Sequence, residues 1–440
     1  MRTARQAATW RSLVGERLRN SVHAFPECAF DLPVRTRSLL GFRMHVVADP
    51  PALQRVLLDN KANYPRPALA QRVMRPVLGR GLLTAEGEAW RVQRRLVAPT
   101  FAPGAVARMG ELIAQAGARH VSAFPAGRAC LDMAGVATAT TMSIIVDALF
   151  SGDKRLATPE ALRRIDDLLS PGGSVRLLSL LGLDRAAVTP SARRARAGNR
   201  FLRETLTALV RERGPTGGAD DFFGDLIRAL RERFDADEAE TLAVDNAVTF
   251  YVAGFETTAN ALAWTVYLLA AQPALQADAR DEAAAALRTG DWGTLADRLP
   301  LLRAILDESL RLYPPAPNFS REALAGDDLG CVSVERGDLI GVFPWIVHRH
   351  RALWEQPDAF DHRRFLGDAK AAHHRFQYLP FGAGPRVCVG ARFAVTEALV
   401  VLAQWLAARR FSVPGGFTPD PVGSVTLRPR GGMPLWVEPL

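Results

Sequence analysis

The stretch Phe381-Gly-Ala-Gly-Pro-Arg-Val-Cys-Val-Gly390 sets one cysteine, Cys388, between glycines and directly before the strongly helical segment 389–409. Glycines such as Gly382 let the backbone turn tightly and approach a flat ligand closely. The positive end of a helix favours the thiolate form of a cysteine, and backbone N–H groups can point at the sulfur. The stretch therefore predicts a thiolate at Cys388. The alternative is a buried structural cysteine, which is the better explanation for an isolated one.

A second pattern lies within the long apolar segment 238–271, where Ala253-Gly-Phe-Glu-Thr-Thr258 interrupts the hydrophobic residues. A helix that is apolar on nearly every face is expected to lie buried inside a large protein. Polar side chains in such a helix need partners, because burying them unpaired is unfavourable. Gly254 permits a local distortion of the helix, of a kind often found at functional sites. The alternative is a notch for helix packing with a satisfied hydroxyl.

Two further pairs of residues lie at helical spacing. Glu308 and Arg311 are three positions apart and can pair on one helix face. Trp90 and Arg94 are four positions apart and likewise share a face. Each pair alone is a weak signal, since such spacings occur on many helices.

The composition is that of a globular protein with a large core. Of 440 residues, 48% are hydrophobic and 23% are charged. The net charge of +9, from 55 basic and 46 acidic residues, is spread along the chain in pairs such as Arg94-Arg95 and Arg363-Arg364. The sequence contains no basic block with interleaved aromatic residues, so it does not predict a nucleic-acid-binding surface. We interpret the charge first as solvated helix faces and second as a docking face for an acidic protein.

The cysteines and the N-terminus bear on location. Cys28, Cys130, Cys331 and Cys388 are far apart and form no CxxC pair, which favours a reducing compartment. The basic start of the chain lacks the apolar core of a signal peptide. No stretch reaches the roughly 18 consecutive apolar residues of a membrane-spanning helix. We therefore expect a cytoplasmic protein without a membrane span.

The chain is predicted to be mostly helical, with short strands and no internal repeat. Since no composition shift marks a linker, we expect one domain, 36–440, after an N-terminal segment, 1–35, that carries little signal. The proline- and glycine-rich segment 65–88 is expected to be a long loop with short helical pieces. A strand is expected over 44–48, followed by a helix that begins after Asp49, and another helix is expected to start near Glu88 and to break at Pro99. A small sheet is expected at the C-terminus. The remaining helices are expected over 131–150, 190–213, 238–271, 299–312 and 389–409.

Together these motifs resemble the cytochrome P450 family. The stretch 381–390 has Phe, Gly, Gly, Arg, Cys and Gly at the family's spacings, and WRVQRR, AGFETT and ESLR precede it in the family's order. The resemblance runs from about residue 40 to the end of the chain. It implies a single-domain fold, mainly α with a minor β region, that holds haem b between the long helix and the cysteine loop. Cys388 would be the axial ligand of the haem iron, where a thiolate favours O–O cleavage.

The same resemblance gives Glu256 and Thr257 catalytic roles. Thr257 would hydrogen-bond the iron-bound oxygen and hold a water, and Glu256 would connect that water to solvent protons. Heterolytic cleavage of the O–O bond takes two protons at the distal oxygen, which fits an acid beside a hydroxyl.

Further site residues follow from the family's motifs. Arg364 would complete a buried structural triad with Glu308 and Arg311, although His362 stands where the family usually has proline. Arginine suits the two haem propionates, because its guanidinium binds carboxylates through paired hydrogen bonds. The resemblance assigns haem binding to Trp90, Arg94, Arg321, Arg386, Phe381, Gly382 and Gly254, and substrate contact to Phe250, Ala253, Asn318, Phe319 and the segments 65–88, 171–189 and 422–425.

The implied activity is that of a monooxygenase, which inserts one atom of dioxygen into a hydrophobic small molecule with two electrons. The chain ends soon after its final strands, without a flavin- or iron–sulfur-binding extension. Electrons from NAD(P)H would therefore arrive indirectly, through a ferredoxin- or flavodoxin-type donor and its reductase. We expect an acidic donor to dock on the cysteine side of the haem, at Arg386, Arg392 and basic residues near Arg94.

Three alternatives remain open. A haem-thiolate peroxygenase or isomerase would tend to lack the acid–alcohol pair, which is intact here as Glu256-Thr257. A non-catalytic haem-binding sensor or carrier would need neither that pair nor a substrate channel. A haem-free helical protein would keep Cys388 as a packing residue. A zinc site is not predicted, because the spacings of His348, His350, His362, His373 and His374 match no common zinc pattern.

Overall fold

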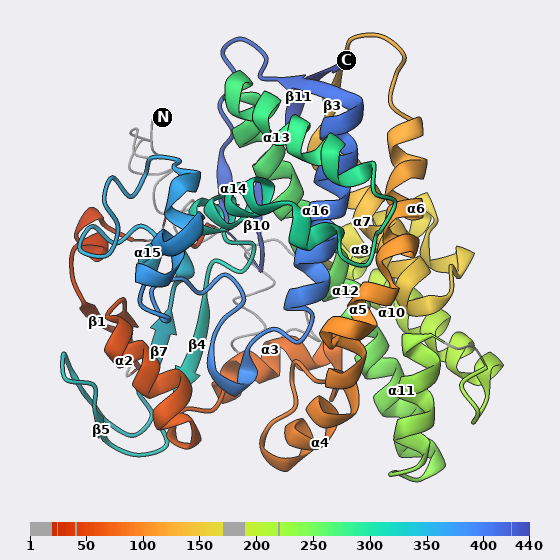
Figure 1. Ribbon diagram of the computed structural model, residues 1–440. Coiled ribbons are helices and arrows are strands. Elements are labelled where there is room, and N and C mark those ends of the chain that lie inside the picture. The colour runs from red at the N-terminus through yellow and green to blue at the C-terminus, as the bar shows by residue number, and fades with distance from the viewer. Residues whose placement is uncertain (1–19, 24, 40–41, 170–189, 219–220, 424) are drawn as a thin grey trace. The chain divides into compact units, whose positions relative to one another are not determined.

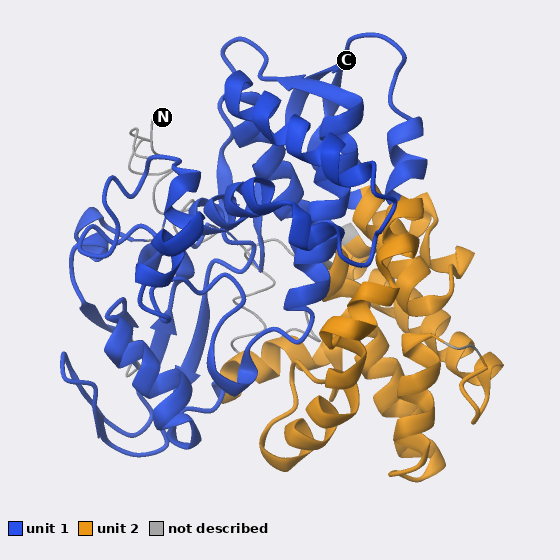
Figure 2. Ribbon diagram, in the orientation of Figure 1, with its two compact units in different colours: residues 1–67, 117–138, 257–440 blue, residues 68–116, 139–256 orange. Residues whose placement is uncertain are grey.

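Helices dominate the computed structural model, which describes residues 20–440 apart from 24, 40–41, 170–189, 219–220 and 424 (Figure 1). The chain divides into two compact units (Figure 2). Unit 1 comprises Met1–Pro67, Gly117–Thr138 and Thr257–Leu440, and unit 2 comprises Ala68–Ala116 and Ala139–Glu256. The prediction of a mainly α fold with a minor β region is confirmed.

Unit 1 contains all the strands among the described residues, and its main sheet has the order β1-β2-β7-β4. β1 (Val34–Leu39) runs antiparallel to β2 (Phe42–Val47), which runs parallel to β7 (Leu339–Val342), and β4 (Phe319–Glu322) runs antiparallel to β7. Smaller sheets join β3 (Ala129–Asp132), β11 (Pro434–Pro439) and β8 (Arg409–Ser412), then β9 (Pro421–Gly423) with β10 (Leu427–Pro429), and β5 (Asp327–Asp328) with β6 (Ser333–Val334).

The main sheet of unit 1 packs on short helices rather than facing water. Val342 pairs with Val47 on one side and with Phe319 on the other. Val47 and Val342 are at most 1% exposed, and so are Leu53 of α2 (Pro50–Gln54) and Ile346 of α15 (Pro344–Val347). α2 begins where expected, because the Asp49 carboxylate accepts the Ala52 N–H and Pro50 occupies the first turn. The helices of this unit are α2 (Pro50–Gln54), α13 (Pro273–Leu287), α14 (Pro300–Leu312), α15 (Pro344–Val347) and α16 (Ala391–Ala408), with short turns η1 (Glu27–Phe30), η2 (Arg55–Asp59), η3 (Lys61–Asn63), η7 (Leu295–Arg298), η8 (His362–Phe365), η9 (Gly367–Ala372) and η10 (Gly384–Arg386).

Unit 2 contains helices joined by turns, and no strand lies among its described residues. An aromatic cluster lies at its centre, where Phe250 is 4.9 Å from Phe222 and 5.8 Å from Phe101 between ring centroids. The helices are α3 (Ala68–Leu78), α4 (Gly87–Val97), α5 (Pro103–Arg108), α8 (Pro159–Leu169), α10 (Pro190–Arg213) and α11 (Phe222–Arg231), with η4 (Ala98–Phe101) and η5 (Lys154–Leu156). Three helices, α6 (Gly110–Ser122), α7 (Met133–Phe150) and α12 (Ala236–Ala270), have residues in both units.

Most of the predicted helices are present, and α10 has the bounds that the sequence predicted. α12 covers 236–270 where 238–271 was expected. The segment 65–88 differs, because it contains the 11-residue helix α3 in place of short helical pieces. Pro76 lies in the last turn of α3, and the proline and glycine content of the segment led to the prediction of a loop, because proline inside a helix removes one of its hydrogen bonds. The segment 171–189 lies outside the described residues.

Two described helices, α7 and α16, are long and apolar enough to cross a membrane by length and composition alone. The structure buries 61% and 67% of their most apolar 18-residue windows. Core helices of large proteins share this composition, so neither helix is a sign of a membrane span. The sequence estimate overlooked them, because it counted uninterrupted apolar runs and not the average over a helix.

Residues on both sides of the expected domain boundary at residue 36 belong to unit 1. The Asn20 amide donates to the carbonyl of Pro421 at 3.0 Å and accepts the Gly423 N–H at 2.8 Å. The division into 1–35 and 36–440 stays a prediction.

Candidate active site

The loop that carries Cys388 is closed by its own backbone. The Cys388 N–H donates to the Phe381 carbonyl at 2.9 Å, across the turn η10. Gly382 and Gly384 have φ of +71° and +70°, which is the left-handed region that favours glycine. A side chain at Gly384 would lie 1.9 Å from the Leu57 carbonyl, whereas one at Gly382 would meet nothing within 4 Å. The lack of a side chain at Gly384 thus lets the loop pack closely against Leu57 of η2. The space beside Gly382 is open.

The Cys388 side chain is exposed and lies just before α16, whose N-cap residue is Gly390. The positive end of the α16 dipole favours negative charge at this position. Cys28 and Cys130 are exposed as well, so exposure alone does not distinguish Cys388. Cys388 is distinguished by its place in a loop bounded by glycines and directly before the start of α16.

In α12 the polar segment around Glu256 lies beside an open face. Glu256 is 6% exposed and Thr258 is 2% exposed, whereas Ala253 is exposed and Thr257 is partly so. Ala253 and Thr257, four residues apart, share a helix face. This face of an otherwise buried helix can be reached by a ligand.

The local distortion expected at Gly254 is not what the structure shows, because α12 is a continuous α-helix from Ala236 to Ala270. The glycine serves close packing instead: a side chain there would lie 2.7 Å from the Ile145 Cδ1 of α7. Thr141 of α7 also donates its hydroxyl to the Phe255 carbonyl at 3.0 Å. Gly254 therefore lets α7 and α12 approach each other at the polar segment.

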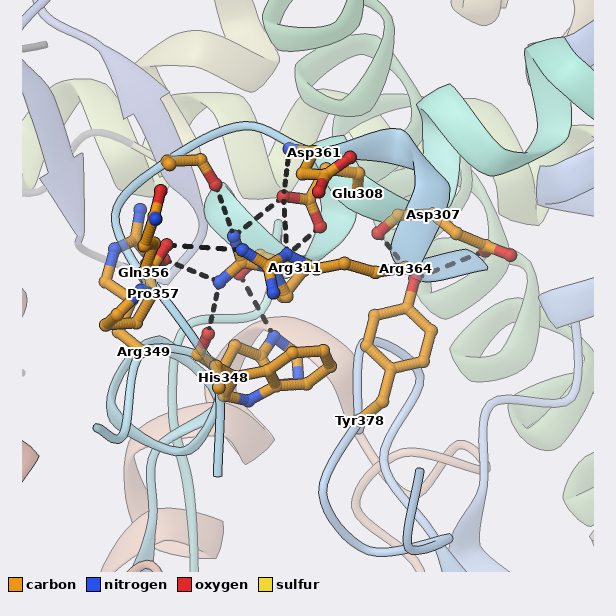
Figure 3. Close-up of polar contacts among 12 residues, drawn as sticks. Asp307, Glu308, Arg311, His348, Arg349, Gln356, Pro357, Asp361, Arg364 and Tyr378 are labelled. Carbon is orange, nitrogen blue, oxygen red and sulfur yellow. Dashed lines mark hydrogen bonds and ion pairs between the residues drawn. The ribbon is translucent and has the colours of Figure 1, made fainter. Parts of the chain in front are cut away.

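Glu308 and Arg311 form a fully buried ion pair within α14 (Figure 3). Arg311 donates Nε and Nη2 to the two Glu308 oxygens at 2.7 Å each. Its remaining donors reach the carbonyls of His348, Pro357 and Ala359 at 2.6, 2.7 and 3.0 Å. All five N–H groups of a guanidinium are thereby used.

Arg364 lies beside this pair, as the third residue of the expected triad. Its Nε is 3.7 Å from Glu308 Oε1, and its Nη2 donates to the Glu355 carbonyl at 2.6 Å (Figure 3). The Asp361 N–H also donates to Glu308 Oε1, at 2.9 Å. His362, which replaces the family's usual proline, begins the short helix η8, and Asp361 caps that turn by accepting the Arg363 N–H. The structure therefore brings the three residues together despite the departure at His362.

His348 connects this network to the segment before the cysteine loop, a role that the sequence did not predict. Its Nε2 accepts the Leu379 N–H at 2.7 Å, and its Nδ1 lies 3.2 Å from the Arg311 carbonyl. Burial, with the charges of Arg311 and Arg349, lowers the pKa of His348 to about 3, so the ring is neutral. Since Nε2 accepts, the proton is on Nδ1 and is donated to Arg311. The signal was present in the sequence as Val347-His348-Arg349-His350, whose histidines were rejected as zinc ligands and given no other role.

The expected propionate-binding residues lie in both units. Arg321, on β4 of unit 1, is 8% exposed and donates to the Ser320 carbonyl at 2.9 Å. Arg386 lies in η10, two residues before Cys388. Trp90 and Arg94 lie on α4 of unit 2 and are both partly exposed.

The expected substrate-contacting residues also divide between the units. Phe250 of unit 2 is 7% exposed within its aromatic cluster. In unit 1, Asn318 donates to the Ser21 hydroxyl at 3.1 Å, and Phe319 lies under the Arg321 guanidinium at 5.2 Å. Within the described part of the chain, no group of three His, Cys, Asp or Glu residues could hold a metal ion.

Known proteins resemble this chain in sequence and in fold. The family model described as Cytochrome P450 matches residues 18–435. Cyclooctat-9-en-7-ol 5-monooxygenase of Streptomyces melanosporofaciens is 31% identical over 378 residues, which cover 85% of this chain and 81% of the relative. The crystal structure of the cytochrome P450DA heme domain has 26% identity and a TM-score of 0.76, and the match covers 93% of this chain and 90% of that one. That of a cytochrome P450, CYP102L1, has 23% identity, a TM-score of 0.81 and coverage of 98% and 96%, and it shows the fold alone.

The class that the fold and these matches define is a haem-thiolate monooxygenase, an oxidoreductase with haem b as its cofactor. The chain belongs to the cytochrome P450 family, which confirms the resemblance found in the sequence. The residues of unit 1 fit that cofactor. Cys388 offers an exposed sulfur, the open space at Gly382 suits a flat ring, and Arg321 and Arg386 suit its carboxylates.

Proposed function

We propose that Cys388 is the axial ligand of the haem iron, and that the enzyme inserts one atom of dioxygen into a hydrophobic small molecule. The observation that carries this proposal is the exposed residue Cys388 in a loop closed by the hydrogen bond from the Cys388 N–H to the Phe381 carbonyl. An iron-bound thiolate supplies electron density that favours O–O cleavage.

The remaining cofactor-binding residues hold the haem by charge and shape. Trp90, Arg94, Arg321 and Arg386 bind the propionates, because a guanidinium matches a carboxylate through paired hydrogen bonds. The haem ring is bordered by Phe381, Gly382 and Gly254. Glu308, Arg311 and Arg364 do not touch the haem and instead support the loop that carries its ligand.

Glu256 and Thr257 move the protons of the reaction. The buried Glu256 side chain relays protons from solvent toward the Thr257 hydroxyl, which lies at the open face of α12. An intact acid–alcohol pair supports a monooxygenase over a peroxygenase or isomerase, and over a carrier without turnover.

The substrate is apolar and lies against the open face of α12. Phe250 and Ala253 support this, as does the named substrate of the Streptomyces relative, cyclooctat-9-en-7-ol. That compound is the first ligand to test. Phe319 and Asn318 add contacts from β4 and the residue before it, together with the segment 65–88.

Electrons come from a separate ferredoxin- or flavodoxin-type protein and its reductase, which draws on NAD(P)H, in the cytoplasm. No disulfide joins the four cysteines, all of which lie among the described residues, and this supports a reducing compartment. Exposed Arg95 and Arg392 support an acidic donor.

The ferrous–carbon monoxide difference spectrum of the purified protein tests the central assignment. A strongly red-shifted Soret band is expected, and Cys388→His should abolish that band and monooxygenation even where haem is retained. A Soret band at the position typical of histidine-ligated haem would overturn the assignment of Cys388. A colourless protein after reconstitution with haem would overturn the haem site as a whole.

A further inference from the structure

A second polar set lies in the N-terminal half of α12, apart from the Glu256-Thr257 pair. Asp245, Asn246 and Thr249 are at most 5% exposed, and they interrupt the apolar stretch 242–255 of this helix. The proposed chemistry uses none of the three. All their partners given below belong to unit 2.

Asp245 binds two elements at once. Its Oδ2 accepts the backbone N–H of Arg80 at 2.7 Å, and its Oδ1 accepts both Nη1 and Nη2 of Arg203 at 2.9 Å. Arg80 belongs to the turn that follows α3, and Arg203 belongs to α10. The carboxylate therefore joins α10 and that turn to α12.

Arg203 also holds the end of α3. Its Nη2 donates to the Val77 carbonyl at 3.0 Å, and Asn199, one turn earlier on α10, donates to the Pro76 carbonyl at 2.9 Å. The last carbonyls of a helix have no partner inside the helix, so these donors satisfy them. A cation at this end also complements the helix dipole.

The turn after α3 lies flat on α12. Gly79 has φ of +57°, and a side chain there would lie 2.0 Å from the Asp245 carboxylate. A side chain at Gly81 would lie 2.7 Å from both the Asp245 carbonyl and the Thr249 hydroxyl. Asn246 extends the contact by accepting the Leu82 N–H at 2.9 Å. If the turn 79–82 separated from α12, the Asp245 carboxylate and several backbone groups would lose their partners.

We propose that Asp245 and Arg203 are positioning residues that hold α3 and the turn 79–82 against α12, and thereby set how fast an apolar substrate enters and leaves. This inference rests on the proposed function, in which the segment 65–88 lines the substrate site. The Asp245 side chain is 4% exposed, so removing Arg203 leaves a buried carboxylate without its main partner. We therefore expect α3 and the turn 79–82 to detach from α12 more often.

A second ion pair between the same helices provides a matched control. Arg211 of α10 and Glu240 of α12 lie 2.9 Å apart, but their side chains are 69% and 28% exposed. The pair does not include α3. An exposed pair of this kind contributes little, so its loss should leave the segment in place.

The test uses the full-length holoenzyme and two measurements. Rates of apolar ligand binding and release are followed by the change in haem spin state, with cyclooctat-9-en-7-ol as the probe. Hydrogen exchange is followed at the amides of Arg80 and Leu82. Arg203→Met and Asp245→Asn should each raise the release rate and both exchange rates by about tenfold. Arg211→Met and Glu240→Gln should change them by less than about twofold.

The double variant Arg203→Met/Asp245→Asn separates a shared role from general damage. If the two residues act as a pair, the double variant releases ligand no faster than the single ones. Release and exchange rates of Arg203→Met equal to those of Arg211→Met would overturn the proposal. If Arg203→Met does not fold, Arg203→Lys replaces it, because a retained charge should restore slow exchange at Arg80. Hydrogen exchange needs no haem chemistry, so it tests the held segment even if the carbon monoxide spectrum refutes the proposed function.

Discussion

Arg311 shows how a single buried charge organises the region before the cysteine loop. The pair with Glu308 alone would be weak support for stability, since removing two charges from water is costly. The compensation comes from three carbonyls, those of His348, Pro357 and Ala359, which take the remaining N–H groups. Arg311 thus fixes the path of a segment that has little regular structure of its own.

Arg311→Lys is therefore expected to destabilise the protein by about 3 kcal/mol or more, because an ammonium has three donors and cannot match the planar fork. Guanidinium chloride unfolding of the holoenzyme measures the change. Arg363→Lys is the control, since the Arg363 side chain is 77% exposed and pairs with Asp361 on the surface. It should change the free energy of unfolding by less than about 1 kcal/mol. Equal effects of the two substitutions would contradict the role of Arg311.

Thr257→Ala is expected to leave haem and ligand binding intact and to lower product formed per NAD(P)H by about tenfold or more. Without the hydroxyl, reducing equivalents should appear as hydrogen peroxide or water. Product yield and peroxide measured in one reaction check the result. Thr265→Val is the control on the same helix, because the Thr265 hydroxyl already donates to the Ala261 carbonyl at 2.7 Å. An unchanged yield in Thr257→Ala would refute the proton-transfer role.

At the scale of elements, His348 joins the end of α14 to the chain that leads to Cys388. Leu379 donates to the His348 ring, and the Leu379 carbonyl accepts the Gly382 N–H at 3.1 Å. Only a neutral imidazole with its proton on Nδ1 can both donate to Arg311 and accept from Leu379. The link therefore depends on the protonation state of one ring.

This dependence predicts a loss of stability in acid. The pKa of His348 is about 3 in the folded protein, below the ordinary value of 6.5, because of burial. Between these values the unfolded chain binds the proton and the folded one does not, so stability falls as pH drops from 6.5 toward 3, by about 1 kcal/mol per pH unit. His348→Asn should remove this part of the slope, measured by unfolding at several pH values. His374→Asn removes an exposed histidine and should keep the wild-type slope.

The sequence predicted the elements whose own pattern is strong. α10 and α12 are long and uninterrupted, and their bounds lie within two residues of the predictions. α3 was underestimated, because its proline suggested a break and because Asn199 and Arg203, far away in sequence, satisfy its end. The site followed the same division. The loop of Cys388 was visible as a local motif, whereas the bond between His348 and Leu379 depends on tertiary packing across 31 positions.

The polar residues of α12 illustrate a signal that was present and not used. Asp245 and Asn246 interrupt the apolar helix just as Glu256 and Thr257 do, and the same argument about buried polar groups applies to them. A family motif drew attention to the second set only. The partners of the first set, Arg80 and Arg203, could not be inferred from spacing, because three separate elements meet there.

At the scale of the whole molecule, the net charge of +9 bears on how electrons arrive. Attraction between a basic protein and an acidic donor raises the association rate, and salt weakens it over a Debye length of about 8 Å at physiological ionic strength. Arg95 and Arg392 are exposed, and Arg392 lies 3.5 Å from Asp297 in an ion pair whose side chains are 51% and 64% exposed. Both charges are therefore available to a partner.

We expect the second-order rate of electron transfer from a ferredoxin or flavodoxin to fall as ionic strength rises. Arg95→Glu and Arg392→Glu should each lower that rate about tenfold at low salt and flatten its salt dependence, because local charge steers the encounter. Stopped-flow reduction of the carbon monoxide complex measures the rate. Arg233→Glu makes the same change in net charge at another exposed arginine and should have a smaller effect. If all three variants slow reduction equally, net charge alone governs the encounter, and the docking site proposed at Arg95 and Arg392 is wrong.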